Sequence, residues 1–340
     1  MIFVYLSFLA VDIYTTNFLA TSETTSETIQ ANLFLLFDGF VILMMYALSY
    51  TRFILLQKLT AVTRVLSQED FNDMAKLFHT KDIFGIVLLL VHIPNCYKGI
   101  TLSTLQCMTT LYIVMVHYAL DMFYMNCVCL LRACFKRINE DLNELNKPLV
   151  NLHSSASRVE QKHGKSLLLL MKLKHLEDLH LQISDVVEIL NKTFLARIVV
   201  MTVSTFTVVT FNVYFYLLWS GGGFASSLGQ QFWYIRYVSA ALYYLLKFSL
   251  VIWACQTATN QAKEIGTTIH DVLSKCTDGT LKRELRLFSL QVLHRDNTFS
   301  ARAVIMNTKL LAQIIGGILM YIMILLQFFL NSVVCKLKYD

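Results

Sequence analysis

The sequence has few prolines, few charges and no alternating strand-like segments. Two prolines and twelve glycines occur in 340 residues, and Asp, Glu, Lys and Arg make up 15% of the chain against 56% for hydrophobic residues. Because soluble domains carry about 25% charged residues, this composition excludes an ordinary soluble domain. The apolar residues form runs close to the roughly 20 residues that cross a bilayer, unlike the short alternating segments of a membrane β-barrel. The sequence predicts an all-α membrane protein surrounded by lipid.

Motifs for catalysis, metal binding or nucleic-acid binding are also lacking. The eight cysteines form no CxxC pair and no Cys/His spacing suited to zinc, so we expect no metal or other cofactor. The sequence leaves undecided whether Cys96 and Cys107 form a disulfide. HGKS at 163–166 lacks the upstream glycine of a phosphate-binding loop, and no HExxH or GxSxG occurs, so we predict that the protein is not an enzyme. The net charge of +6 follows no interleaved aromatic pattern, and no nucleic-acid partner is expected.

Seven apolar segments are compatible with membrane-spanning helices, since lipid forces backbone polar groups to pair within the segment. They cover about 1–20, 31–51, 82–97, 103–131, 194–219, 233–254 and 306–335. The third segment is short for a span, and we allow it to begin a few residues earlier.

Basic residues are concentrated in alternate connections. The connections after the second, fourth and sixth segments hold five, ten and seven Lys and Arg, whereas TSETTSETIQ (21–30) and SGGGFASSLGQQF (220–232) hold none. Cytoplasmic connections are enriched in these residues, so the basic side is the cytoplasm. Seven spans then place the N-terminus inside and the C-terminus outside, the reverse of a G-protein-coupled receptor. Asn191-Lys-Thr193 matches an N-glycosylation motif, but on the cytoplasmic side we expect it to be unmodified.

Two cytoplasmic connections, 132–193 and 255–305, are too regular to be linkers. The stretches 167–190 and 282–293 carry apolar residues at helical spacing among mixed charges, which predicts amphipathic helices. These helices either lie on the inner lipid surface or pack into a cytoplasmic anchor region shared between subunits. Acidic residues such as Glu177 and Asp185 weaken attraction to anionic lipid and favour the second interpretation. Without an evident linker or repeat, 1–340 is interpreted as a single domain.

The last apolar segment has two unlike faces. One face carries polar or small residues beside two apolar ones: Gln313, Gly317, Met320, Ile324, Gln327 and Asn331. The opposite face is wholly apolar: Ile315, Leu319, Ile322, Leu326, Phe329 and Val333. Uncharged amides inside a bilayer face either protein or water. The polar stripe is therefore either a helix-packing surface or the wall of a pore, where rings of amide oxygens replace part of a cation's hydration shell.

The same segment resembles the C-terminal signature of insect gustatory receptors. In that family the last helix carries Thr-Tyr, five hydrophobic residues and Gln-Phe, and the matching residues here are Met320, Tyr321, the run IMILL, Gln327 and Phe328. A Leu-His pair at 293–294, Phe299 and the small Ala301 also resemble the family. The sequence departs from the pattern at Met320, which replaces Thr and makes that level less polar, and at Ala303, which replaces Gly.

The resemblance implies a function. It implies a homotetrameric or heterotetrameric cation channel in the plasma membrane of chemosensory neurons, surrounded by membrane lipid and opened by a small-molecule tastant. The last helix would line the pore and the cytoplasmic helices would anchor the subunits. Sugar-sensing members carry Glu directly after the motif Tyr, where this sequence has Ile322, so bitter or other non-disaccharide tastants fit better. The sequence starts inside its first predicted span, without the cytoplasmic tail usual in the family, which fits a short or incomplete member.

Receptors of this family bind their ligand in the outer half of the bundle formed by helices 2 to 6, and the resemblance implies the same place here. Pockets for small molecules are mostly apolar with a few polar anchors. The candidate ligand-binding residues are Asp38, Phe215, Trp219, Trp233, Tyr237 and Tyr244. Trp219 and Trp233 border the outer connection and could equally belong to an interfacial aromatic belt.

Two further ionisable residues, Asp121 and Lys247, lie within apolar segments. Charged side chains are costly when they face lipid, so both must find partners. We favour an internal ion pair over direct contact with a ligand. His92 and His117 are interpreted as hydrogen-bonded core residues.

Two alternative functions stay open. An insect odorant receptor shares the topology and the pore helix but usually lacks the Tyr-to-Gln-Phe ending. A secondary transporter would show repeated halves and helices broken by Gly or Pro near mid-membrane, and neither feature is evident.

Overall fold

A computed structural model describes most of the chain. The described residues are 10, 37, 39–41, 43–44, 46–97, 104–154, 159–221, 228–302 and 304–337. Within them, only the backbone is described at 92–97, 104–110, 113, 146–154, 159–165, 219–221, 228–233, 236 and 332–337.

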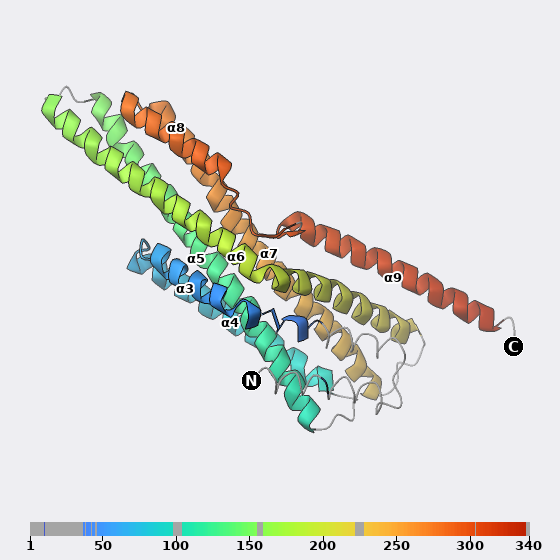
Figure 1. Cartoon of the computed structure of the whole chain (residues 1–340). Coiled ribbons are helices and arrows are strands. Elements are labelled where there is room, and N and C mark those ends of the chain that lie inside the picture. The colour runs from blue at the N-terminus through green and yellow to red at the C-terminus, as the bar shows by residue number, and fades with distance from the viewer. Residues whose placement is uncertain are drawn as a thin grey trace.

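Three very long helices form the body of the molecule (Figure 1). They are α5 (Thr104–Ser154), α6 (Val159–Gly221) and α7 (Leu228–Lys275). At 1.5 Å per residue, helices of 48 to 63 residues are about 70 to 95 Å long, more than twice the apolar thickness of a bilayer. Each of them is therefore long enough to cross a membrane and to continue well beyond it. We call the continuation that carries α8 the membrane-distal bundle.

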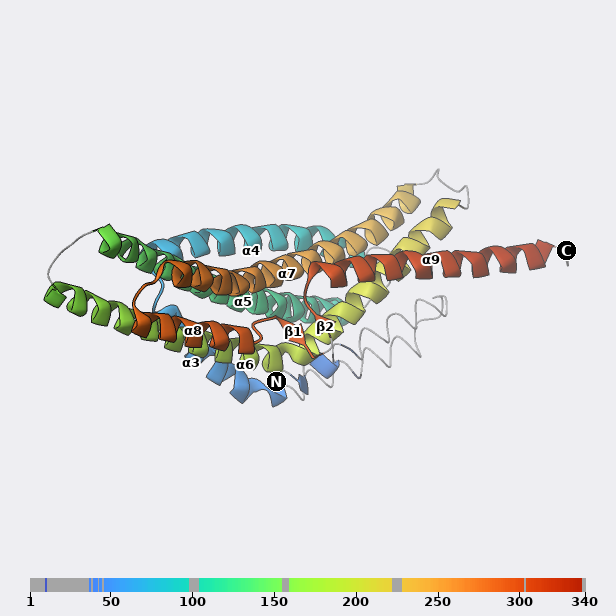
Figure 2. The ribbon, with the colours of Figure 1, turned by 90° about the horizontal axis from the view of Figure 1, so that it is seen from above.

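Shorter helices surround this body. Helices α3 (Ser49–Thr63) and α4 (Gln68–Tyr97) lie on its flanks, with α4 against α7 and α3 against α6 (Figure 2). Helix α8 (Gly279–His294) folds back along the distal end of α7, where the Asp278 carboxylate caps its first turn by accepting from the Thr280 amide at 2.9 Å. Capping by Asp satisfies a backbone donor that the helix itself leaves unpaired.

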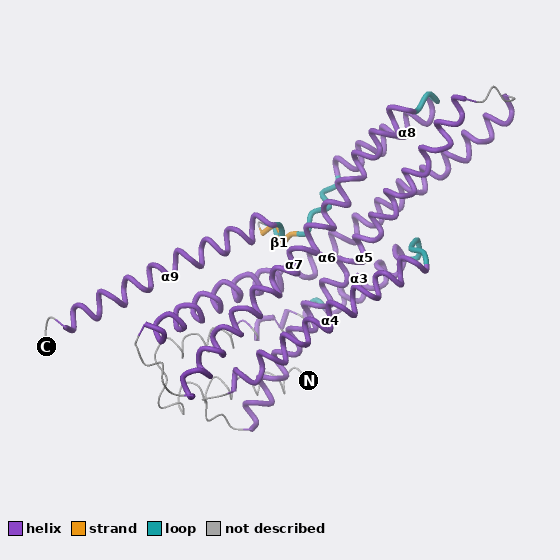
Figure 3. The backbone as a smooth tube through the Cα atoms, turned by 180° about the vertical axis from the view of Figure 1, so that it is seen from behind, coloured by secondary structure: helices purple, strands orange, loops and turns teal. Residues whose placement is uncertain are grey.

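A short hairpin precedes the last helix (Figure 3). Strand β1 (Ser300–Ala301) pairs antiparallel with β2 (Val304–Ile305), and Arg302 in the turn has a φ of 53°, in the left-handed region that tight hairpin turns require. Helix α9 (Thr308–Leu337) then runs away from α8, so that its last turn lies at the opposite end of the molecule (Figure 1). The sequence analysis did not predict this hairpin, because its two-residue strands are too short to show an alternating pattern.

The hydrophobic core of the subunit continues into the membrane-distal bundle. Phe135, Leu142, Leu173, Ile269 and Phe288 are fully buried there, although all lie outside the predicted spans. Helices α5, α6 and α7 pass from the predicted spans into this bundle without a break. The interpretation in which these connections lie on the lipid surface is therefore wrong, because their apolar faces pack on one another.

Among the described residues, four helical segments are long and apolar enough to cross a membrane. They are Val114–Leu145, Ser166–Leu218, Tyr237–Lys275 and Thr308–Asn331, within α5, α6, α7 and α9. The predicted third span, 82–97, forms the second half of α4. The predicted span 1–20 lies outside the described residues apart from Ala10, and 31–51 is described in part.

Candidate functional site

The amide side chains of the polar stripe of α9 face away from the rest of the subunit. Gln313, Met320, Gln327 and Asn331 are exposed, and Gly317 and Ile324 are half-buried. The face that packs on the body carries Ile314, Ile318 and Ile322, which are at most 8% exposed. The amides of the stripe are thus not used to hold α9 against its own subunit. Packing within one subunit does not explain them, which leaves a neighbouring subunit or a water-filled path.

The apolar face of α9 is divided between two surroundings. Ile322 is buried and Leu326 packs against the core, whereas Ile315, Leu319 and Phe329 are exposed. The α9 span is the most apolar of the four candidate spans, yet 17% of its most apolar stretch of 18 residues is buried in the subunit. Such a surface is stable in contact with lipid or with other copies of the helix.

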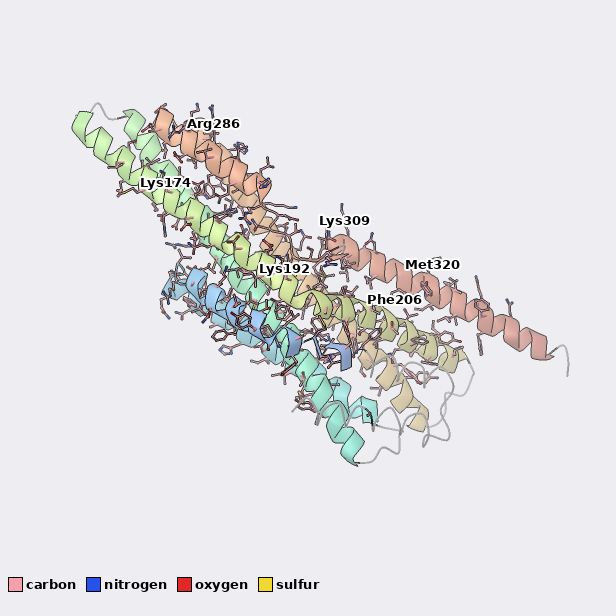
Figure 4. All side chains as sticks on the ribbon, in the orientation of Figure 1. Lys174, Lys192, Phe206, Arg286, Lys309 and Met320 are labelled. Carbon is pink, nitrogen blue, oxygen red and sulfur yellow. The ribbon has the colours of Figure 1, made fainter. Side chains whose placement is uncertain are left out.

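Phe206 of α6 joins the two helices at the level of the motif Tyr (Figure 4). Its ring lies edge-on to Tyr321, with 5.4 Å between ring centroids and 89° between planes. A Cβ added at Gly317 would lie 3.1 Å from a carbon of the same ring, so glycine permits the close approach. All three motif residues are exposed in the subunit, and Tyr321 also contacts Phe206 of α6.

A buried charged cluster joins α5, α6 and α7. The carboxylate of Asp121, 1% exposed, lies 2.7 Å from the guanidinium of Arg197 and 2.9 Å from the Lys247 ammonium. Arg197 also donates to the His117 carbonyl at 3.1 Å and from Nη1 to His117 Nδ1 at 2.9 Å. Because arginine cannot accept, Nδ1 is the acceptor and His117 is neutral in this arrangement. The predicted internal ion pair and the hydrogen-bonded role of His117 are confirmed.

Arg197 is the member of this cluster that sequence reasoning missed. It stands near the start of the fifth predicted segment, outside the connections whose basic residues indicate the topology. The available signal was a charged residue inside an apolar segment, which needs a partner of opposite charge just as Asp121 and Lys247 do. Without a partner, either cation would be costly in this buried place.

Aromatic residues of α6 and α7 meet towards the ends of these helices that lie away from the membrane-distal bundle. Phe215 stacks on Tyr237 at 5.8 Å between centroids, and both side chains are buried. Tyr244 lies apart from this pair, beside Tyr243 and 5.0 Å from the Lys247 ammonium. The structure thus brings together Phe215 and Tyr237 and places Tyr244 next to the charged cluster.

The remaining ligand-binding candidates are not described. Asp38 and the side chains of Trp219 and Trp233 lie outside the described residues, as do the side chains of His92, Cys96 and Cys107. Among the side chains that are described, no group of three or more His, Cys, Asp or Glu could hold a metal ion.

The helical body, the membrane-distal bundle and a last helix held at one side define a polytopic helical membrane protein. Residues 1–332 match the model of the 7tm chemosensory receptor family, and the chain belongs to that family. This is a family of receptors and not of enzymes. The expectations of an all-α seven-transmembrane fold and of an insect gustatory-type relationship are both confirmed.

Individual relatives agree with this assignment. A segment of 160 residues is 24% identical to a Drosophila melanogaster protein named as gustatory receptor 28b, and covers 46% of this chain and 34% of that protein. The matched segment thus spans about a third of the relative's length. The structure of the insect olfactory receptor OR5 from Machilis hrabei superposes with a TM-score of 0.71 at 12% identity, covering 96% of this chain and 88% of that chain. The structure of OR5 in complex with eugenol gives a TM-score of 0.66 at 13% identity over the same shares. At these identities the likeness to OR5 establishes the fold.

Proposed function

We propose that the chain is a subunit of a tastant-gated, non-selective cation channel in which α9 lines the pore. The observation that carries this proposal is the outward direction of Gln313, Gln327 and Asn331 on a helix that is otherwise strongly apolar. Amide oxygens arranged in rings by several copies of one helix can replace part of a cation's water shell. The charges of Asp121, Arg197 and Lys247 pair with one another inside the bundle, and we assign them no part in conduction.

The pore is tested at Gln327, with Leu326 as the matched control on the face that packs against the subunit. Gln327→Ala or Gln327→Glu should change the permeability ratios or the single-channel conductance in cells that express the receptor. Leu326→Ala should chiefly lower the amount of receptor at the cell surface. Equal effects of both changes on permeability would contradict the pore and favour a packing role for the stripe.

A tetramer, homomeric or heteromeric, is the assembly that we propose. Four copies of α9 would surround one axis, and the membrane-distal bundle would hold the copies together. Helix α8 supports this role, because Leu287, Leu290 and Leu293 are 48%, 60% and 83% exposed on its outward face. Exposed apolar stripes of this kind mark contact surfaces. Native mass spectrometry of the purified receptor should give four subunits, and Leu290→Glu with Leu293→Glu should lower the order of assembly.

We propose bitter or other non-disaccharide compounds as ligands, acting at the plasma membrane of chemosensory neurons. Ile322, which stands where sugar-sensing members have Glu, is buried against its own subunit and offers no polar group to a sugar. OR5 was solved with the small aromatic molecule eugenol. A binding place that extends along α7 from the stacked Phe215 and Tyr237 towards Tyr244 would suit an apolar ligand of similar size. Asp38, Trp219 and Trp233 are further candidates.

The ligand class is tested by a panel of sugars, bitter compounds and volatile odorants during whole-cell recording. Loss of a ring contact at Tyr237→Ala or Tyr244→Ala should shift the half-maximal concentration by roughly five- to thirty-fold and leave single-channel conductance unchanged. An odorant-receptor function is the second candidate, favoured by the likeness to OR5, and predicts responses to volatiles alone. Solute uptake without ion current would instead indicate a secondary transporter.

A further inference from the structure

One side chain of α6 holds the segment that joins α8 to α9. The Asn191 amide donates to the Thr298 carbonyl at 2.8 Å and accepts from the Ser300 amide at 3.2 Å. Between these two backbone groups, the Phe299 side chain is fully buried. Asn191 thus satisfies a donor and an acceptor of a segment that has no helix, and both ends of its own amide are used.

Two more contacts tie the same segment to α6. His180, fully buried, lies 3.2 Å from Gln291 Nε2 and 3.3 Å from the Asn297 amide. Gln291 donates to His180 Nδ1, so the proton of the neutral His180 ring is on Nε2. The side-chain amide of Asn297 accepts a hydrogen bond from this N–H when its oxygen Oδ1 faces the ring. Arg295 pairs with Asp185 at 3.2 Å, but this pair is partly exposed and contributes little to stability. Of the three contacts, the one at Asn191 is nearest to α9.

The hairpin connects the segment that Asn191 holds to the start of α9. The Met306 amide donates to the Phe299 carbonyl at 3.0 Å, which closes β1 on β2, and Asn307 caps α9 by accepting from the Leu310 amide at 2.9 Å. Helix α9 itself buries little surface in the subunit. Its position therefore depends strongly on where its N-terminal end is held.

In the other direction, Asn191 is close to the charged cluster. Arg197 follows six residues later on the same unbroken helix, about 9 Å along its axis. Arg197 is locked to Asp121 of α5, which also binds Lys247 of α7. Within two turns, α6 thus carries both an ion-paired contact with its neighbours and the attachment of the α9 segment.

We propose that Asn191 is a positioning residue for gating, which ties the start of α9 to α6 so that a shift of α6 within the bundle moves the pore helix. This role rests on the channel function proposed above. A ligand changes an equilibrium only by its different affinities for two arrangements, and the ligand-binding region and the pore share those arrangements only if a structural element connects them. At the start of α9 this connection consists of two hydrogen bonds from the Asn191 amide, and farther along α9 the Phe206–Tyr321 contact adds to it.

The first test compares Asn191→Ala with Lys192→Ala, whose exposed side chain pairs with Glu188 and does not touch the segment. In the full-length receptor, Asn191→Ala should lower the ratio of ligand-evoked to ligand-free current by about ten-fold, as expected for the loss of two hydrogen bonds. Asn191→Asp keeps the acceptor for Ser300 and loses the donor to Thr298, so its ratio should be intermediate. Lys192→Ala should match the wild type, and single-channel conductance should stay unchanged in all variants.

The second test uses hydrogen exchange of the purified receptor and needs no current. The Ser300 amide should exchange slowly in the wild type and in Lys192→Ala, and about ten-fold faster in Asn191→Ala. Rapid exchange of Ser300 in the wild type would contradict the attachment. Faster exchange in Asn191→Ala with an unchanged current ratio would overturn the gating role and leave the channel function intact. A wild-type receptor that carries no current at all would overturn the channel function itself.

Discussion

The membrane-distal bundle and α9 are stabilised in opposite ways. In each of the three long helices, 50% to 61% of the most apolar stretch of 18 residues is buried in the subunit, compared with 17% in α9. The long helices therefore pack within one chain, and so does the membrane-distal bundle into which they continue, where Phe135, Leu142 and Phe288 are fully buried. Helix α9 is attached through Phe206, three buried isoleucines and the segment at Asn191, and relies on lipid or other copies for the rest of its surface. A helix with few fixed contacts can move at low cost, which suits a gate.

The largest difference between the two regions should appear when a phenylalanine is removed from each. Phe288→Ala leaves a cavity in the fully buried core of the bundle and should lower the free energy of unfolding by about 3 to 5 kcal/mol. Phe328 of α9 is 70% exposed in the subunit, and Phe328→Ala should change it by less than about 0.5 kcal/mol. Thermal unfolding of the purified receptor measures both. Equal losses would mean that α9 is as firmly packed as the bundle.

The charged cluster should be almost as sensitive. Asp121→Asn removes the carboxylate that binds Arg197 and Lys247 and leaves two buried cations without it, at a cost of about 3 to 5 kcal/mol. The matched control is Glu188→Gln, which breaks an exposed pair with Lys192 and should cost at most about 1 kcal/mol. Surface expression and thermal unfolding report the difference, and a mild effect of Asp121→Asn would show that the cluster is solvated.

Stability of the bundle should depend on pH through His180. Burial, and to a smaller extent Arg295, lowers the pKa of His180 to about 4. Between pH 6.5 and 4 the unfolded chain binds a proton there that the folded chain does not. The contribution is complete above pH 6.5 and is lost as the pH falls towards 4, and it amounts to at most about 3 kcal/mol.

Thermal unfolding between pH 7 and 4.5 tests this dependence. The unfolding temperature of the wild type should fall more steeply with acid than that of His180→Gln. A change at the exposed His175 should leave the wild-type slope intact. Parallel curves for the wild type and His180→Gln would exclude His180 as the titrating group.

The smallest effect should come from the two adjacent glycines of α9. Gly317→Ala places a methyl group 3.1 Å from the Phe206 ring and should weaken the attachment of α9 by about 1 kcal/mol. Gly316→Ala meets nothing within 4 Å and should be neutral or slightly stabilising, because alanine favours a helix. The unfolding temperatures should differ by a few degrees, and Phe206→Leu should restore Gly317→Ala. Identical unfolding temperatures for both alanine variants would show that the Phe206 ring moves aside without a cost in stability.

The sequence by itself determined the membrane class, the helical spans and the two-faced last helix. Long apolar segments leave the backbone no alternative to helix in lipid, and the positions of Gln313, Gln327 and Asn331 on one face follow from helical geometry alone. The partners within the cluster were determined in part, since buried Asp121 and Lys247 each require an opposite charge. The amphipathic pattern of 167–190 and 282–293 was compatible with either a lipid surface or a bundle.

Tertiary structure decided what depends on contacts between distant parts of the chain. Three contacts of this kind join residues from separate helices or segments. Arg197 completes the charged cluster, Phe206 fits against Gly317, and Asn191 holds the backbone at Thr298 and Ser300. No periodicity encodes such pairs, because each depends on the relative rotation and offset of two helices. Asn191 shows this most clearly: its local sequence matches a glycosylation motif, while its amide in the folded chain is committed to the backbone that leads into α9.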